Sequence, residues 1–226
     1  RSRRADDALQ LVDELITEAR RIGSANTGTF RPEDEERKEL EYLAINGAVV
    51  RSVLGIIDQN LRPLPASSTR IYRTEIPQGL YASVMGSNPS SSRREANPVE
   101  SVTYTEAEAF ANRCGWILGA KVRLPTSAEF SAAAGDLSKP SNLGQAWTAE
   151  NTDGATVHPV GTAAANASGI HDLIGNVEEW VMAVPGDTRA PVLGGSILTP
   201  LGKVLAAKTV FKREKNRTLG FRIVIE

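Results

Sequence analysis

The sequence predicts an α+β protein in which a helical N-terminal segment precedes a loop-rich folded domain. Only two of the twelve aromatic residues, Phe30 and Tyr42, come before Pro63, and only four of the nineteen glycines do so. Pro63 and Pro65 place the boundary there, because proline stops a helix and biases the preceding residue toward extended backbone. We therefore expect a helical hairpin or coiled coil over residues 1–62, a linker over 63–70 and a folded domain over 71–226.

Two helices are expected in the N-terminal segment. The first runs from Ala5 to Ile22, with small and apolar residues every three or four positions, and Gly23 ends it. The second begins near Pro32 with an acidic first turn and carries a heptad seam. The seam residues are Leu40, Leu43, Gly47, Val50, Leu54, Ile57 and Leu61. Two interpretations are open: an αα-hairpin packed on its own domain, or a coiled coil that contacts a protein partner or another domain.

Two shorter helices and a closing strand are expected after the boundary. Tyr104 to Leu118 has an apolar face at helical spacing, and the sequence suggests Thr105 as its N-cap with Glu108 completing a capping box. A second helix begins at Thr126, with Glu129 three residues on and Phe130 facing inward. From Ala190 onward the pattern is typical of strands, and the last of them is expected to end the chain.

Composition excludes several classes of site. A single cysteine rules out an internal disulfide, and two histidines, His158 and His171, rule out a three-histidine metal site. A net charge of -1 gives no overall attraction to nucleic acid, and no run of about 18 apolar residues could span a membrane. Because the chain begins at Arg1 rather than Met, a preceding leader, anchor or domain is compatible with the sequence, which assigns no compartment.

A series of short motifs runs through the second region in a fixed order. They include Glu75-Ile76-Pro77, Asn97-Pro98-Val99, Arg123-Leu124-Pro125-Thr126, Gly169-Ile170-His171-Asp172, Gly175-Asn176-Val177-Glu178-Glu179-Trp180, Gly194-Gly195-Ser196 and Gly220-Phe221-Arg222. In this order they resemble the formylglycine-generating enzyme family, also called the sulfatase-modifying factor family, over residues 71–225. The resemblance implies a C-type lectin-like fold with few regular elements, long ordered loops and a small twisted sheet.

The chemistry of that family depends on cysteines that this chain lacks. The resemblance implies oxidation of a substrate cysteine with oxygen and copper, by a cysteine pair shortly before the closing Gly-Phe-Arg. Residues 199–219 contain neither Cys nor Met, whereas copper(I) prefers sulfur ligands. Cys114 lies on the apolar face of a predicted helix, where we expect a buried core residue. We therefore expect no copper and no catalytic residues.

The resemblance also implies a structural calcium ion in the loop before Trp180. Its ligands fall on the Asp172 carboxylate, the Gly175 and Val177 carbonyls and the Glu179 carboxylate, all hard oxygen ligands. The alternative is a turn at Asp172 and a salt bridge at Glu179.

Two further sets of residues have expected roles. Arg222 lies in an apolar closing strand, so we expect a structural role and a carboxylate partner, either Glu129 or Glu179, with Trp180 also structural. The stretch 199–217 is rich in cations, and its Lys203, Lys208, Phe211, Lys212 and Arg213 form a possible binding face for a protein or an acidic ligand. The alternative is an ordinary solvated surface. Few aromatics argue against nucleic-acid binding.

The leading hypothesis is a non-catalytic member of the family that serves as a binding or assembly module. The first alternative is a metal-dependent oxidoreductase with altered chemistry around His158 or His171, which otherwise are structural or surface residues. The second is a retroelement-diversified ligand-binding protein whose variable face lies near 199–217.

Overall fold

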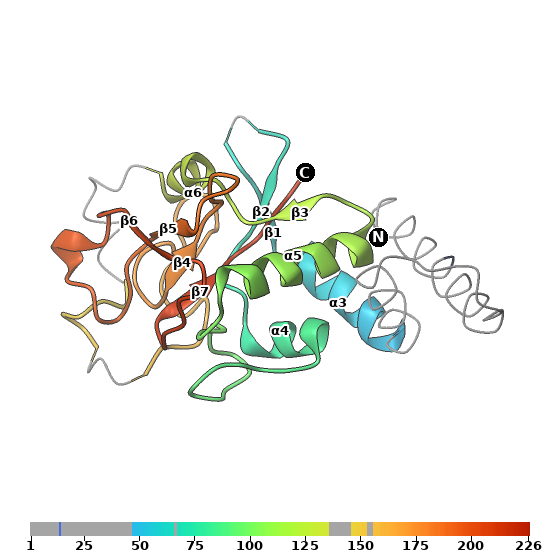
Figure 1. The fold of residues 1–226 in the computed structure, drawn as a ribbon, viewed down its shortest axis with the longest axis horizontal. Helices are drawn as coiled ribbons and strands as arrows, with labels where there is room; N and C mark the ends of the chain where they lie inside the picture. The colour runs from blue at the N-terminus through green and yellow to red at the C-terminus, as the bar shows by residue number, and fades with distance from the viewer. Residues whose placement is uncertain (1–13, 15–46, 66, 136–145, 153–155) are drawn as a thin grey trace.

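The structure is a computed structural model, and it describes residues 14, 47–65, 67–135, 146–152 and 156–226 (Figure 1). Apart from Glu14, the first predicted helix lies outside these residues, and so does the start of the second. So do Leu40 and Leu43 of the heptad seam, and the coiled coil therefore stays a prediction. Among the described residues, no helix has the length and apolar character needed to cross a bilayer.

Two four-stranded sheets and four α-helices make up the described fold, which confirms the predicted α+β class. The first sheet is antiparallel, with the strand order β1 (Leu61–Pro63), β2 (Arg70–Tyr72), β8 (Val224–Ile225) and β3 (Val122–Arg123). The second has the order β6 (Lys208–Phe211), β5 (Arg189–Leu193), β4 (Glu178–Trp180) and β7 (Leu219–Phe221), and only β4 and β7 run parallel. The helices are α3 (Gly47–Gln59), α4 (Gln78–Met85), α5 (Tyr104–Leu118) and α6 (Ser127–Ala134), with a 3-10 turn, η2 (Leu201–Lys203).

Aromatic rings form the centre of the larger core. Phe110 of α5 stacks on Tyr81 of α4 with ring centroids 5.5 Å apart, and Phe221 of β7 meets both rings edge-on. Figure 1 shows α3, α4 and α5 gathered at one end of the molecule, with the β4–β7 sheet and α6 at the other. Burying these large side chains supplies much of the folding free energy, at about 25 cal/mol per Å² of apolar surface.

The helix before the predicted boundary packs into this same core. Val53, Leu54 and Ile57 of α3 are buried against α4 and α5, whereas Ile56 is 39% exposed. For the described part of the heptad seam, the apolar face therefore packs on the chain's own domain.

The predicted linker over 63–70 lies within a β-hairpin. Leu61–Pro63 pairs with Arg70–Tyr72 as a β-hairpin, and Leu64 is buried in a second core cluster with Ile71 and Phe130. Pro63 ends the helical pattern as expected, but proline is also tolerated at a sheet edge, where β1 lies.

Capping boxes fix the starts of α5 and α6. At α6 the box is formed by Thr126 and Glu129, as predicted. At α5 it is formed by Thr103 and Glu106, so the predicted pair Thr105 and Glu108 is wrong by two residues. Both pairs have the same spacing, and only the extended backbone of Thr103 (φ -74°, ψ 163°) distinguishes the true N-cap.

Candidate functional site

A fully buried ion pair lies at the junction of the two sheets. Arg222, between β7 and β8, donates from Nε and Nη2 to the two carboxylate oxygens of Glu179 on β4, at 2.6 Å each. Both side chains are 0% exposed. The same guanidinium also donates from Nη2 to the backbone carbonyls of His171 and Asp172, at 3.1 Å each. The pair ties β4 to the closing strands and to the loop before β4.

Of the two carboxylates expected beside Arg222, the structure selects Glu179. Glu129 instead binds Arg123 through both of its oxygens at 2.7 Å, and this pairing, with the cap hydrogen bonds, lowers the pKa of Glu129 to about 2. Trp180 is 0% exposed, and its Nε1 donates to the Val102 carbonyl at 3.0 Å.

A third carboxylate, Glu75, lies near this pair and was missed by the sequence analysis. It is 0% exposed and accepts hydrogen bonds from Asn176 Nδ2 at 3.1 Å and the Val177 amide at 3.2 Å. Burial raises its pKa well above the usual value, and the nearby Asp172 and Glu179 raise it further. Its position in the motif Glu75-Ile76-Pro77, directly before a buried isoleucine, was the available signal.

The residues predicted to bind calcium are held by other contacts. Asp172 accepts a 2.6 Å hydrogen bond from the Gly161 amide through Oδ2, while its buried Oδ1 has no hydrogen-bond partner in the described part of the chain. Both oxygens of Glu179 accept hydrogen bonds from Arg222, which is the salt bridge expected as the alternative to a calcium ligand. Within the described ranges no three His, Cys, Asp or Glu residues are placed to hold a metal ion. Calcium bound through the Asp172 and Glu179 carboxylates and the Gly175 and Val177 carbonyls stays a prediction.

The two histidines contact neighbouring protein groups, and the cysteine is buried in the core. His171 Nδ1 lies 2.8 Å from the Ala163 carbonyl oxygen, and its Nε2 lies 3.3 Å from Arg73 Nη2. His158 stacks on Trp147 with the ring centroids 3.8 Å apart. Cys114 is 0% exposed, and burial raises the pKa of its thiol well above the usual value, which disfavours the reactive thiolate.

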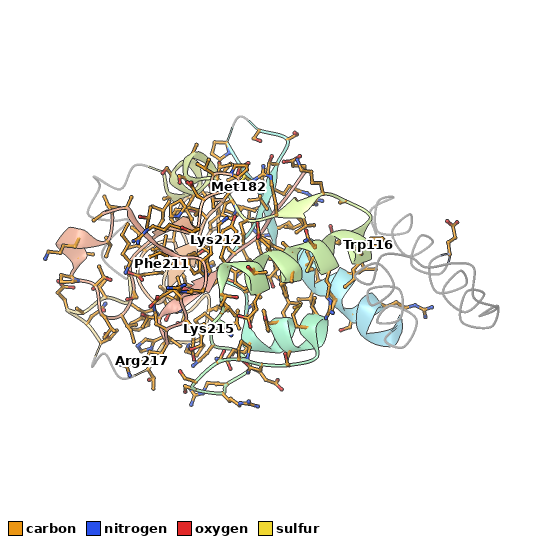
Figure 2. The ribbon with its side chains drawn as sticks, in the orientation of Figure 1. Trp116, Met182, Phe211, Lys212, Lys215 and Arg217 are labelled. Atoms are coloured by element: carbon orange, nitrogen blue, oxygen red, sulfur yellow. The ribbon has the colours of Figure 1, made fainter. Side chains whose placement is uncertain are left out.

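The predicted basic face is divided by the fold. Phe211, at the end of β6, is 42% exposed, and the guanidiniums of Arg189 on β5 and of Arg213 both lie over its ring. Lys212 lies over the Tyr104 ring, 4.8 Å from its centroid, and Lys208 pairs with Glu178 on β4. Figure 2 shows Phe211 and Lys212 beside one another, with Lys215 and Arg217 further along the same segment.

Lys203 and Lys208 differ from the other predicted face residues. Lys203 belongs to η2, a separate turn, and Lys208 is engaged by a carboxylate. Arg189 was missed by the sequence analysis, because only the pairing of β5 with β6 brings it opposite Phe211.

Comparison with known proteins identifies the family. Residues 71–226 match the family model described as the sulfatase-modifying factor enzyme 1-like domain. The formylglycine-generating enzyme of Mycobacterium tuberculosis is 33% identical over 124 residues, which span 46% of this chain and only 40% of that protein. Chaperone protein LppX of Paenibacillus barcinonensis is 26% identical over 196 residues, which span 61% of this chain and 69% of that protein.

Solved structures share the fold at low identity. Treponema denticola variable protein 1 superimposes with a TM-score of 0.61 at 21% identity, covering 74% of this chain and 91% of its own. PvdO of Pseudomonas aeruginosa gives a TM-score of 0.60 at 18% identity, covering 70% of this chain and 80% of its own. Together with the family-model match over residues 71–226, these neighbours support the fold that the motifs implied. The chain therefore belongs to the formylglycine-generating enzyme, or sulfatase-modifying factor, family.

Proposed function

We propose that this protein is a non-catalytic member of the family that acts as a binding or assembly module. The observation that carries the proposal is the state of its one cysteine. Cys114 is fully buried in the core face of α5, and the segment before Gly220-Phe221-Arg222, where the family's cysteine pair is expected, holds no sulfur atom. Cysteine chemistry needs an accessible thiolate, and this chain offers none.

The interior supports a scaffold role. Arg222, Glu179 and Glu75 are each 0% exposed. Arg222 binds Glu179, and Glu75 accepts a hydrogen bond from the Val177 amide. Such buried polar contacts fix long loops in one arrangement, which suits a domain that presents a surface. One relative, 26% identical, is named a chaperone protein.

The test is an oxygen-dependent turnover assay with copper and a sulfatase-derived peptide that contains the target cysteine. Mass spectrometry would follow conversion of cysteine to formylglycine. We expect no conversion by this protein, and the Mycobacterium tuberculosis relative serves as the positive control. Turnover above the copper-only background would refute the proposal.

Metal analysis separates the remaining alternative. An oxidoreductase with altered chemistry would require stoichiometric iron or copper near His158 or His171. We expect neither metal to copurify, and we expect calcium chelation to lower the melting temperature if Asp172 contributes to a calcium site. Stoichiometric iron together with oxygen consumption would favour the oxidoreductase.

A further inference from the structure

Three side chains form a stack on the exposed end of the second sheet. Arg189 and Phe211 are directly paired residues of β5 and β6, so their side chains lie on the same face of the sheet. The Arg189 guanidinium carbon lies 4.5 Å from the centre of the Phe211 ring, and that of Arg213 lies 5.0 Å from it. We call Arg189, Phe211 and Arg213 the Arg–Phe–Arg stack.

Hydrogen bonds to the neighbouring strand hold Arg189 in place within the stack. Arg189 donates from Nη2 to the Thr209 carbonyl and from Nε to Thr209 Oγ1, across the neighbouring strand. The strand pairing explains how Arg189 on β5 contacts the Thr209 carbonyl at the far side of β6. Pro191 lies opposite Thr209, and its carbonyl accepts from the amide of Val181, the residue after β4, so it faces away from β6. In an antiparallel pair the opposite carbonyl then faces away too, so the Thr209 carbonyl lies at the open edge of β6. Holding a long side chain in one rotamer lowers the entropy lost on binding.

The charges of the stack are available to a ligand. Two neighbouring lysines are neutralised, Lys208 by Glu178 and Lys215 by Glu106. In the part of the chain that the structure describes, Arg189 contacts the Phe211 ring and two Thr209 oxygens, and Arg213 contacts the Phe211 ring. Neither guanidinium lies within 4.0 Å of a carboxylate oxygen of the described residues. A guanidinium stacked on a ring still presents N–H groups at its edge, where they match a carboxylate.

We propose that the Arg–Phe–Arg stack binds an acidic segment of a protein partner. This inference rests on the proposed binding function and names the chemistry of the partner. The two guanidiniums would bind Asp or Glu carboxylates of the partner, and the exposed Phe211 ring would contact the aliphatic stems of these acidic side chains. A nucleic-acid strand fits less well, because such strands are bound by several aromatic side chains and Phe211 is the single one in this segment.

Fluorescence anisotropy on the full chain tests the proposal. The probe is a fluorescein-labelled peptide of alternating Glu and Gly, with the matching Gln and Gly peptide as its neutral counterpart. We expect the acidic peptide to bind and to weaken as salt rises. The double variant Arg189→Gln with Arg213→Gln should weaken binding at least about tenfold. The matched control, Lys121→Gln, removes an exposed cation that pairs with Glu226, and it should bind like the wild type.

Three outcomes would overturn the proposal: unchanged binding in the double variant, an equal loss in the control variant, or tighter binding of a single-stranded oligonucleotide than of the acidic peptide. Because the substituted side chains are exposed, both variants should keep the wild-type melting temperature, and this measurement shows that a loss of binding is not unfolding. If the acidic peptide does not bind and the sulfatase peptide is not converted, only the proposed acidic partner is refuted. Turnover of the sulfatase peptide would remove the non-catalytic function instead.

Discussion

Replacing Arg222 with Met should reduce the free energy of unfolding by about 3–5 kcal/mol. The substitution leaves Glu179 fully buried without the guanidinium that binds both of its oxygens at 2.6 Å. It also removes a donor to the His171 and Asp172 carbonyls. Each buried group left unsatisfied costs about 1–3 kcal/mol, so the two estimates agree in size.

The cost should depend on pH with a definite sign. Burial raises the pKa of Glu179, and Arg222 opposes that rise. Without Arg222 the folded-state pKa of Glu179 moves further up, so the deficit is largest at high pH, where the carboxylate must be charged. The deficit shrinks as pH falls through that raised pKa, because the protonated form needs no counter-charge.

Urea unfolding followed by tryptophan fluorescence measures these differences at two pH values. The double variant Arg222→Met with Glu179→Leu removes both charges and should recover part of the loss, because an apolar pair can replace a buried ion pair. The control Lys121→Gln removes an exposed ion pair and should change stability by less than about 1 kcal/mol. A loss below about 1 kcal/mol for Arg222→Met, or an equal loss at both pH values, would refute this account of the cluster.

Three other substitutions test separate features by urea unfolding. Gly175→Ala should cost about 2 kcal/mol or more, because at φ +79° its Cβ would lie 2.2 Å from the Trp147 carbonyl oxygen. Gly186→Ala, at φ +86°, meets no atom within 4 Å and should cost less. Equal costs would show that the close approach at Gly175 does not matter. The wild type should lose stability as pH rises above about 4.3 through the raised pKa of Glu75, and Glu75→Gln should abolish that part of the slope; an unchanged slope would contradict the raised pKa. Thr103→Ala should cost about 1 kcal/mol and Thr105→Ala less than about 0.5 kcal/mol, and the reverse order would restore the cap predicted from the sequence.

Local patterns in the sequence were enough for α5 and α6 and their buried faces, but they did not predict α4 (Gln78–Met85). Phe130, Ala133 and Ala134 are buried as the helical spacing indicates, and Thr126 caps α6 as the box pattern indicates. The α5 cap was placed two residues late, since Thr103-x-x-Glu106 and Thr105-x-x-Glu108 satisfy the same rule. A rule based on spacing cannot separate them without the backbone dihedral angles.

The charged residues needed the tertiary structure. Glu129 and Glu179 were equal candidates for Arg222, and only the parallel pairing of β4 with β7 brings Glu179 beside the closing strands. Glu75 joins this cluster from more than a hundred residues away. Arg189 joins Phe211 in the same way, through the β5–β6 register.

The sequence by itself determined the family motifs, the absence of a cysteine pair and the α+β class, because composition and spacing are properties of the linear chain. Only the tertiary structure decided that α3 and β1 pack with the folded domain, that Glu179 rather than Glu129 pairs with Arg222, and that Arg189 joins Phe211 in the exposed stack. The physical reason is that ion pairs and aromatic contacts act over a few ångströms in space, and chain order does not specify which distant residues come that close.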